Sequence, residues 1–274
     1  MPRHGPPPAV PDAEKWLGAL GRESQAMRRV TSIIRRAAPT SVPILISGET
    51  GTGKRFLART IHELSPRHGQ PFVLLDSSKT RGVRPANSVR FSILNRPIKP
   101  HGWLERSLER AKRGTLVIVE TSEMNTELQA QLLPILDERE RRPPFDKTHA
   151  SLDIRVLALS SVPWEKTVSE GVLLKELYYR LKVFSIELPP LRKRLEDLSF
   201  LAEWFIRHFA QRTQTLPRLV DSECLDALRA YPWPGNVTEL RGVIQAALIR
   251  SHGPRLILGD LPPEIATWKR GTRI

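Results

Sequence analysis

A glycine-rich segment that ends in lysine constrains the fold of this chain more strongly than any other feature. Its residues fit the pattern G-x-x-x-x-G-K: Gly48, Glu49, Thr50, Gly51, Thr52, Gly53 and Lys54. A short apolar run, 41–47, precedes the segment, and a stretch of helical character follows it. Glycines let the backbone fold tightly, so that its N–H groups point inward, and the helix N-terminus adds partial positive charge. The pattern therefore predicts a strand–turn–helix unit that binds nucleotide phosphates, with Lys54 reaching the β- and γ-phosphates.

The residue after the lysine departs from the general pattern. A serine or threonine hydroxyl usually holds Mg²⁺ at this position, whereas this chain has Arg55. Metal coordination at this end must come from elsewhere, for example from Thr52, or be weak, so we assign no metal ligand. Arg55 joins the seven residues of the glycine-rich segment in the predicted cofactor-binding set.

Apolar runs alternate with segments of helical spacing over the first 190 residues. We expect buried strands at 41–47, 71–76, 114–120, 153–160 and 183–188, with helices between them. Strands that alternate with helices predict an α/β domain around a parallel sheet with right-handed crossovers. After Pro189 and Pro190 helices dominate, at about 195–213, 220–230 and 236–250, which indicates a small helical second domain.

These patterns predict four segments along the chain. Residues 1–12 are rich in proline and are expected to be disordered, and residues 13–190 form the nucleotide-binding α/β domain. Residues 191–265 form the helical second domain, and 266–274 form a basic C-terminal tail.

The charge of the chain is strongly basic and is concentrated in one segment. The formal net charge is +14, and residues 77–113 hold ten basic side chains against two acidic ones. Such a balance favours an acidic partner, whether nucleic acid, an anionic membrane surface or an acidic protein. The alternative is a solvated basic surface without a partner.

The cysteine content and the hydropathy of the chain indicate the cellular compartment in which we expect it. A single cysteine, Cys224, cannot form an internal disulfide, which fits a reducing cytoplasm and is typical of a small core residue. The N-terminus has no apolar region typical of a secretory signal, and no apolar run approaches the roughly 20 residues that span a bilayer. We therefore expect a cytoplasmic protein with no membrane partner.

Several long motifs, in the same order, resemble the central domain of bacterial sigma-54-dependent activators over about residues 17–265. They are GETGTGK with FLARTIHELSPR, ELQAQLLPILDERE, LYYRLKVFSIELPPLRKRLEDL and YPWPGNVTELRGVIQAAL. The resemblance implies an AAA+ fold, that is, a P-loop αβα sandwich with a parallel sheet, followed by a small α-helical lid domain. It also implies hexameric rings that hydrolyse ATP with Mg²⁺ to remodel RNA polymerase bound to sigma-54.

The resemblance assigns catalytic roles to two residues, whereas two other catalytic positions of the family hold different residues in this chain. Glu120 matches the catalytic base of Walker B, and Arg180 matches the second arginine finger. Val119 replaces the aspartate that positions Mg²⁺, and a valine cannot ligate a hard cation. Leu174 replaces the first arginine finger.

Further positions also differ from the family pattern. Ser161 replaces the sensor asparagine, Thr238 replaces the sensor arginine of the lid, and Asp76 replaces an asparagine thought to govern the catalytic glutamate. Each change has the alternative of nearby compensation, for example by Arg241. The polymerase-contacting loop of the family, Gly-Ala-Phe-Thr-Gly-Ala, is replaced by NRPIKP at about 95–100. We also expect no helix-turn-helix and no N-terminal sensory domain.

Three functions follow from these observations. The first is a regulatory module of this family that binds ATP with little or no hydrolysis and assembles with itself or a related AAA+ subunit. The second is an active ATPase that remodels sigma-54 RNA polymerase through an altered loop. The third is a binding module for nucleic acid or an acidic protein, in which the basic segment 77–113 makes the contact and nucleotide orders the fold.

Overall fold

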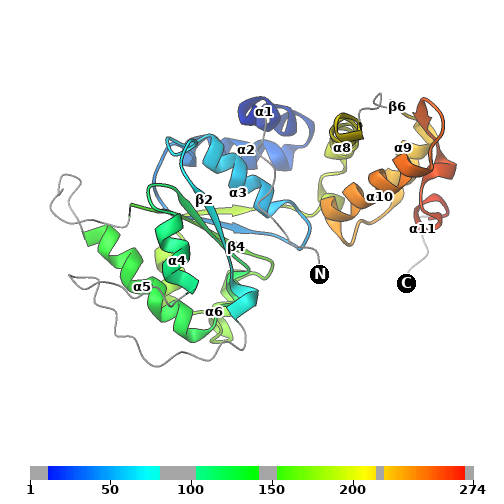
Figure 1. Cartoon of the computed structure of the whole chain (residues 1–274). Helices are drawn as coiled ribbons and strands as arrows, with labels where there is room; N and C mark the ends of the chain where they lie inside the picture. Colours follow the sequence, from blue (N-terminus) through cyan, green and yellow to red (C-terminus); the bar gives the residue numbers. More distant parts are fainter. Residues whose placement is uncertain (1–11, 81–102, 142–152, 214–218, 269–274) are drawn as a thin grey trace. The chain divides into compact units, whose positions relative to one another are not determined.

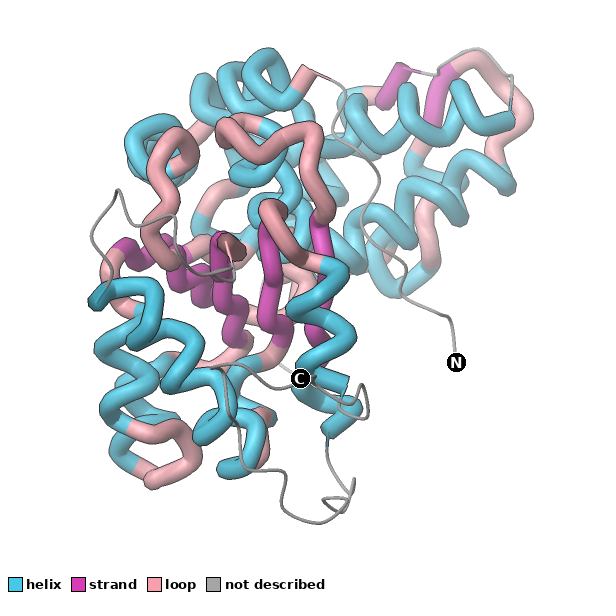
Figure 2. Tube along the Cα trace, turned by 60° about the vertical axis from the view of Figure 1, so that its left-hand side comes forward, coloured by secondary structure: helices cyan, strands magenta, loops and turns pink. Residues whose placement is uncertain are grey.

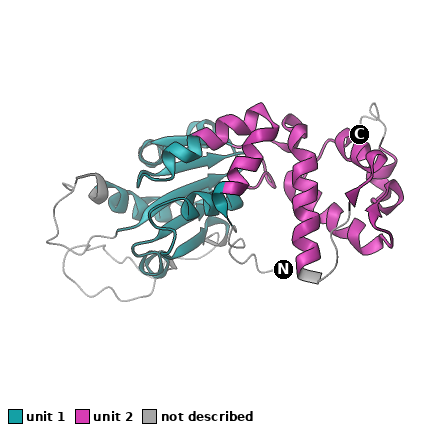
Figure 3. Ribbon diagram, turned by 90° about the horizontal axis from the view of Figure 1, so that it is seen from above, with its two compact units in different colours: residues 1–14, 33–48, 54–187 teal, residues 15–32, 49–53, 188–274 magenta. Residues whose placement is uncertain are grey.

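The computed structural model describes residues 12–80, 103–141, 153–213 and 219–268. The described chain forms two compact units (Figure 3). Unit 1 contains residues 33–48 and 54–187, together with the N-terminal residues up to 14. Unit 2 contains residues 15–32, 49–53 and the chain from 188 onward. The domain ranges expected from the sequence, 13–190 and 191–265, stay predictions.

Unit 1 is built on a sheet of five parallel strands in the order β2-β3-β4-β1-β5, which lie side by side in Figure 2. The strands are β1 (Ile44–Ser47), β2 (Phe72–Asp76), β3 (Thr115–Val119), β4 (Arg155–Ser160) and β5 (Phe184–Glu187). Each lies within one of the five runs expected from the sequence. Strands β3 and β4 are buried along their whole length, as is typical of a parallel sheet covered on both faces.

Helices cover both faces of the sheet in unit 1 (Figure 1). Helix α3 (Lys54–Glu63) packs against β1, β3 and β4. The other face carries a continuous apolar core, which joins strand residues such as Leu116 and Ile118 to four helices. These are α4 (Trp103–Arg110), α5 (Thr126–Arg141), α6 (Trp164–Ser169) and α7 (Lys175–Leu181). The alternation of side chains along each strand supplies both faces with apolar residues.

The carboxyl ends of the strands determine where chemistry takes place. Parallel pairing puts Ser47 opposite Ser160 and Asp76 opposite Val119. The residues that follow β1, β3 and β4 therefore emerge at one edge of the sheet, where α/β proteins bind ligands. The glycine-rich segment, Glu120 and Ser161 all begin at this edge.

Unit 2 is mainly helical, as expected for the C-terminal part. Its helices are α8 (Leu198–Thr213), α9 (Ser222–Ala230), α10 (Asn236–Arg250) and the short α11 (Pro263–Ala266). It also takes in most of α1 (Ala13–Glu23) and the first half of α2 (Gln25–Ala37). Cys224 is fully buried on α9, which confirms the expected core position, and burial raises the pKa of its thiol to about 11.

Strand β6 (Leu219–Val220) and helix α6 are among the short elements that were not expected from the sequence. Strand β6 pairs in parallel with β7 (Arg255–Leu256), and helix α6 precedes α7. A two-residue strand is too short to show an alternating pattern, so only pairing reveals it.

Several sequence expectations fall outside the described residues. They concern most of the proline-rich N-terminus, the central part of the basic segment 77–113, the replacement loop at 95–100 and the end of the basic tail. Within the described ranges, none of the helices combines the length and apolarity that crossing a bilayer requires.

Candidate nucleotide-binding site

Lys54, Ser161 and Glu120 form a chain of hydrogen bonds at the carboxyl edge of the sheet in unit 1. Lys54 is the first residue of α3, and its Nζ donates to Gly48 O at 2.7 Å and to Ser161 Oγ at 2.8 Å. The Ser161 hydroxyl donates in turn to Glu120 Oε1 at 2.8 Å, and the Ser161 N–H donates to Glu120 Oε2 at 3.2 Å. The structure thus brings together two residues expected at the site and links them through Ser161.

The electrostatics of Lys54 reflect this enclosed position. Burial lowers the pKa of the Lys54 amine, and the Glu120 carboxylate acts in the opposite direction. The side chain is only 7% exposed, so its ammonium group has exchanged most of its water for the carbonyl, the hydroxyl and the nearby carboxylate. An anionic phosphate at this edge would meet a cation that is already oriented and largely desolvated.

Glu120 has a strained backbone. It follows β3 directly and adopts the left-handed conformation, with φ 54° and ψ 59°. This region costs a residue other than glycine about 1–2 kcal/mol. The next turn maintains the conformation, because Glu123 N donates to Glu120 O at 2.9 Å and the Thr121 hydroxyl donates to Leu159 O at 3.1 Å. Such strain concentrates at functional positions, which agrees with a role for Glu120 at the site.

Arg55 and Asp76 form an ion pair beside this cluster. Arg55 is the second residue of α3, and its Nη2 lies 3.5 Å from Asp76 Oδ2 at the end of β2. The other oxygen of Asp76 accepts hydrogen bonds from the Ser78 hydroxyl at 2.7 Å and from Ser78 N at 3.3 Å. Val119, the strand partner of Asp76, is only 1% exposed. In the described ranges, no three His, Cys, Asp or Glu side chains gather where they could hold a metal ion.

In unit 2, three successive carbonyls of the glycine-rich segment, those of residues 50–52, accept hydrogen bonds from the C-terminal part of the chain. Asn236 Nδ2 donates to the first at 3.0 Å, Thr238 N to the second at 3.1 Å and Arg194 Nη2 to the third at 2.8 Å. These contacts fix the orientation of three successive peptide groups of the segment from their carbonyl side.

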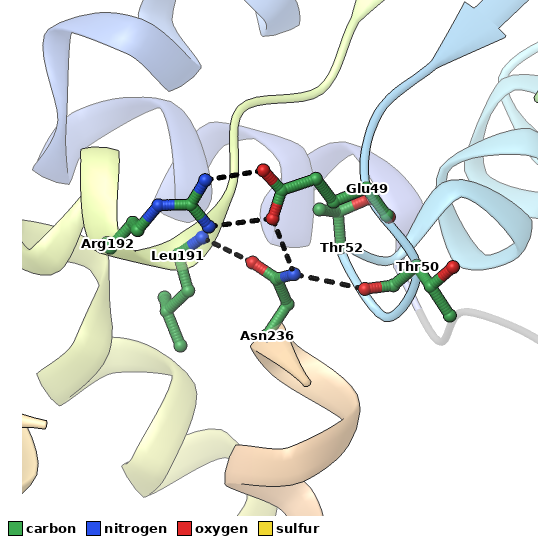
Figure 4. A network of polar contacts seen from close by, with 6 residues as sticks. All are labelled: Glu49, Thr50, Thr52, Leu191, Arg192 and Asn236. Atoms are coloured by element: carbon green, nitrogen blue, oxygen red, sulfur yellow. Dashed lines mark hydrogen bonds and ion pairs between the residues drawn. The ribbon is translucent and has the colours of Figure 1, made fainter. Parts of the chain in front are cut away.

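The Glu49 side chain also connects the segment to Arg192 and Asn236 (Figure 4). Both nitrogens of the Arg192 fork donate to its carboxylate, at 2.7 and 2.5 Å, and Asn236 Nδ2 lies 3.3 Å from Oε2. The Arg192 guanidinium is the main cause that lowers the pKa of the Glu49 carboxyl to about 2. Asn236 also accepts from Leu191 N at 2.8 Å, so one buried side chain connects 49–50 with 191.

Glycine is required at position 51 for two separate reasons. Its φ of +81° lies in the left-handed half of the backbone map, which side chains disfavour. A Cβ atom at this position would lie 2.2 Å from the carbonyl oxygen of Gly235. Gly53 also has a positive φ, +103°, but a Cβ there would meet none of the described atoms within 4 Å. The positive φ values explain why both positions hold glycine. At position 51, the close approach of the Gly235 carbonyl oxygen is a second reason.

The residues aligned with arginine fingers and lid sensors have other contacts. Arg180 on α7 forms an ion pair with Asp137 on α5, at 2.9 Å. Leu174 caps α7 and packs against the apolar core of unit 1. Thr238 contributes its backbone N–H to the glycine-rich segment, and the Arg241 guanidinium lies 6.0 Å from the centre of the Phe209 ring.

Sequence reasoning missed the residues that hold the segment from the C-terminal side, namely Arg192, Arg194 and Asn236. They lie more than 130 positions from the residues that they contact, so no local pattern could connect them. The available signals were the motifs LPPLRKR and WPGN, in which these side chains occur. Ser161 was noted only as a substitution, whereas it bridges the lysine and the glutamate.

Comparisons with known proteins agree with this architecture. Residues 20–191 match the family model described as Sigma-54 interaction domain, and residues 192–273 match the model described as AAA+ ATPase lid domain. Regulatory protein AtoC of Escherichia coli is 35% identical over 266 residues, which cover 94% of this chain and 56% of that protein. Transcriptional regulatory protein ZraR of Salmonella typhimurium is 33% identical over 259 residues, covering 91% and 56%.

A solved structure is similar over most of the chain. The crystal structure of NtrX from Brucella abortus in complex with ATP has a TM-score of 0.69 and 28% sequence identity, covering 88% of this chain and 56% of that one. The same protein has also been solved in complex with ADP, with the same TM-score. The chain therefore spans a little over half the length of these relatives.

Proposed function

Because this chain belongs to the Sigma-54 interaction domain family and carries the AAA+ lid domain, we propose that it is an ATP-binding module that takes part in transcription regulation. Its five-stranded parallel sheet, followed by a helical lid, is the AAA+ fold expected from the sequence. The names of the relatives support the regulatory role, and a related chain was crystallised with ATP.

The observation that carries ATP binding is the orientation of the glycine-rich segment. Its carbonyls at 50–52 accept hydrogen bonds from donors of unit 2, so the segment is held from its carbonyl side and these oxygens do not face an anionic ligand unpaired. In unit 1, Lys54 heads α3 and provides a desolvated cation. ATP would supply the anionic phosphate chain that these groups recognise.

We further propose that hydrolysis is weak or absent. Phosphoryl transfer depends on positioning and charge neutralisation, and the loss of one arginine finger costs roughly 10³–10⁵ in rate where such fingers act. Leu174 is part of an apolar core here, and Val119 is buried and apolar. These losses do not add simply, but each acts on the same transition state.

Glu120 favours the alternative of an active ATPase that remodels sigma-54 RNA polymerase. Its strained backbone and its hydrogen bonds to Ser161 keep the carboxylate at the edge of the sheet, where a base would orient water. The weak-hydrolysis proposal and the active-ATPase alternative therefore differ in the expected rate of ATP hydrolysis, and both include the Glu120 carboxylate. The basic segment 77–113 supports the third proposal, a contact with nucleic acid or an acidic protein, on its charge alone.

The proposed partners follow from family membership. We propose that the chain assembles in a ring in the cytoplasm, with copies of itself or with a related AAA+ subunit. Arg180 would serve the nucleotide of a neighbour in such a ring, after its ion pair with Asp137 has been exchanged. A contact with sigma-54 RNA polymerase would have to use a loop other than the usual one, since NRPIKP replaces it.

Two measurements on the full chain test the proposed function. Calorimetric titration with ATP should show about one site per chain, and Lys54→Ala should abolish the heat of binding. Phosphate release should be at least about 10³-fold slower than that of an ATPase-active family member assayed in parallel. The matched control is Glu120→Gln, which should leave binding intact.

Each outcome separates the proposals. Turnover within about tenfold of the active relative, abolished in Glu120→Gln, would replace the weak-hydrolysis proposal by the active-ATPase alternative. If the wild-type chain and Lys54→Ala are equally unable to bind ATP, nucleotide binding is refuted. Retention of sigma-54 on the immobilised chain in the presence of ATP would support a polymerase contact, and its absence would count against that contact.

A further inference from the structure

Two positions that would place a divalent cation beside the phosphates carry no oxygen ligand. Mg²⁺ requires oxygen ligands in near-octahedral geometry, usually from a hydroxyl after the P-loop lysine and from a carboxylate at the end of the Walker B strand. This chain has Arg55 and Val119 at those positions. Val119 is 1% exposed, and the Thr52 hydroxyl, the alternative considered from the sequence, donates to Glu49 O at 2.8 Å. The residues present do not fit a resident Mg²⁺.

A side-chain cation lies at this edge instead. The Arg55 guanidinium approaches Asp76, whose Cα is the strand partner of Val119, so it lies at the carboxyl end of β2 beside β3. Ser78 holds the second oxygen of Asp76, which fixes the orientation of the carboxylate. A metal ion that used Asp76 would first have to displace an arginine that follows Lys54 directly in α3.

We propose that Arg55 provides the positive charge that a divalent cation provides in related phosphate sites, so that this chain binds ATP independently of Mg²⁺. The inference rests on the proposed ATP binding. A guanidinium is charged at all physiological pH values, and its planar fork matches the geometry of phosphate oxygens. The Arg55 side chain is about one-third exposed, at 32%, so it is not enclosed by the protein. The pair with Asp76 is long, at 3.5 Å, and therefore exchangeable for a phosphate.

The test is a titration of the full chain with ATP, once with excess EDTA and once with several millimolar Mg²⁺. The two dissociation constants should agree within about twofold, whereas a metal-dependent site would weaken at least about tenfold in EDTA. Arg55→Ala should weaken binding in EDTA by about tenfold, and Arg55→Lys, which keeps the charge without the fork, by less. Circular dichroism of each variant verifies that the fold is retained.

Arg55→Thr is the matched variant, because it installs the hydroxyl of the general pattern. It should bind ATP more weakly than the wild type in EDTA and recover at least about threefold on addition of Mg²⁺. Asp76→Asn tests whether Asp76 is instead a metal ligand. Its ATP dissociation constant should be the same with and without Mg²⁺, as expected for the wild type.

The outcomes distinguish this inference from the proposed function. Wild-type binding that requires Mg²⁺ overturns the inference and leaves ATP binding intact. The inference is likewise overturned if Arg55→Ala binds ATP in EDTA as tightly as the wild type. If Mg²⁺ strengthens ATP binding by the wild type but not by Asp76→Asn, the inference is also overturned, because Asp76 would then hold the metal. No binding under either condition refutes the proposed function itself.

Discussion

Replacing Asn236 by alanine should uncouple the glycine-rich segment from the lid region. Asn236 is fully buried and accepts from Leu191 N at 2.8 Å while it donates to Thr50 O at 3.0 Å and lies 3.3 Å from Glu49 Oε2. Its φ of +54° is a conformation that asparagine tolerates better than alanine does. The substitution therefore removes three polar contacts and adds backbone strain at one position.

The expected loss of stability can be estimated from these contacts. Loss of the hydrogen bond to Thr50 O costs about 1 kcal/mol, and the buried Leu191 N–H group, left without its acceptor, costs about 1–3 kcal/mol. Alanine in the left-handed conformation adds about 1 kcal/mol. Because the contact with Glu49 is long and partly exposed, we assign it little, and the sum is about 3–5 kcal/mol.

Native-state hydrogen exchange of the Leu191 amide measures this loss locally, without assuming that both units unfold together. A loss of about 3 kcal/mol corresponds to exchange about 100-fold faster than in the wild type. The ATP dissociation constant should rise in parallel, because Thr50 O is no longer held. Asn236→Gly is the control, since it loses the same contacts without the strain and should be about 1 kcal/mol less destabilised. A change below about 0.5 kcal/mol in Asn236→Ala, or a glycine variant less stable than the alanine variant, would refute the reasoning.

Two further predictions concern pH and the glycines. Burial, followed by the nearby Arg59, lowers the pKa of His62 to about 4 from an ordinary value of 6.5. The unfolded chain therefore binds more protons between these values, so stability is present above about pH 6.5 and is lost as the pH falls toward 4. Between pH 7 and pH 5 the wild type should lose about 2 kcal/mol through this residue, and urea denaturation of His62→Gln, compared at both pH values, should show that much less pH dependence. An unchanged dependence would contradict the assignment. Gly51→Ala should destabilise the chain and weaken ATP binding by more than Gly53→Ala does. Both substitutions strain a positive φ, but only the first places a Cβ 2.2 Å from a backbone oxygen. Equal effects of the two substitutions in thermal denaturation and in ATP titration would exclude the steric explanation.

The five strands could be predicted because each is a local signal. Residues 116–119, for example, are all apolar, and β3 is buried at every residue, as is typical of a strand covered on both faces. The glycine-rich segment was likewise visible, since the positive φ values at positions 51 and 53 demand residues without a side chain. The missed strand β6 is two residues long, and its partner β7 lies about 35 positions later, so its signal is not local.

The site was predictable only in part, for the same reason. The phosphate-binding segment and its lysine follow from a local pattern, and the sequence by itself determined that phosphates are the ligand expected there. Only the tertiary structure decided which groups orient that segment: Ser161 connects Lys54 to Glu120, and Asn236 and Arg194 hold the carbonyls of 50 and 52. The tertiary structure also decided that Arg55 pairs with Asp76, at the edge of the sheet where a divalent cation would otherwise lie. A hydrogen bond between residues more than 100 positions apart leaves no periodicity in a sequence, because it depends on the folded path of the whole chain between them.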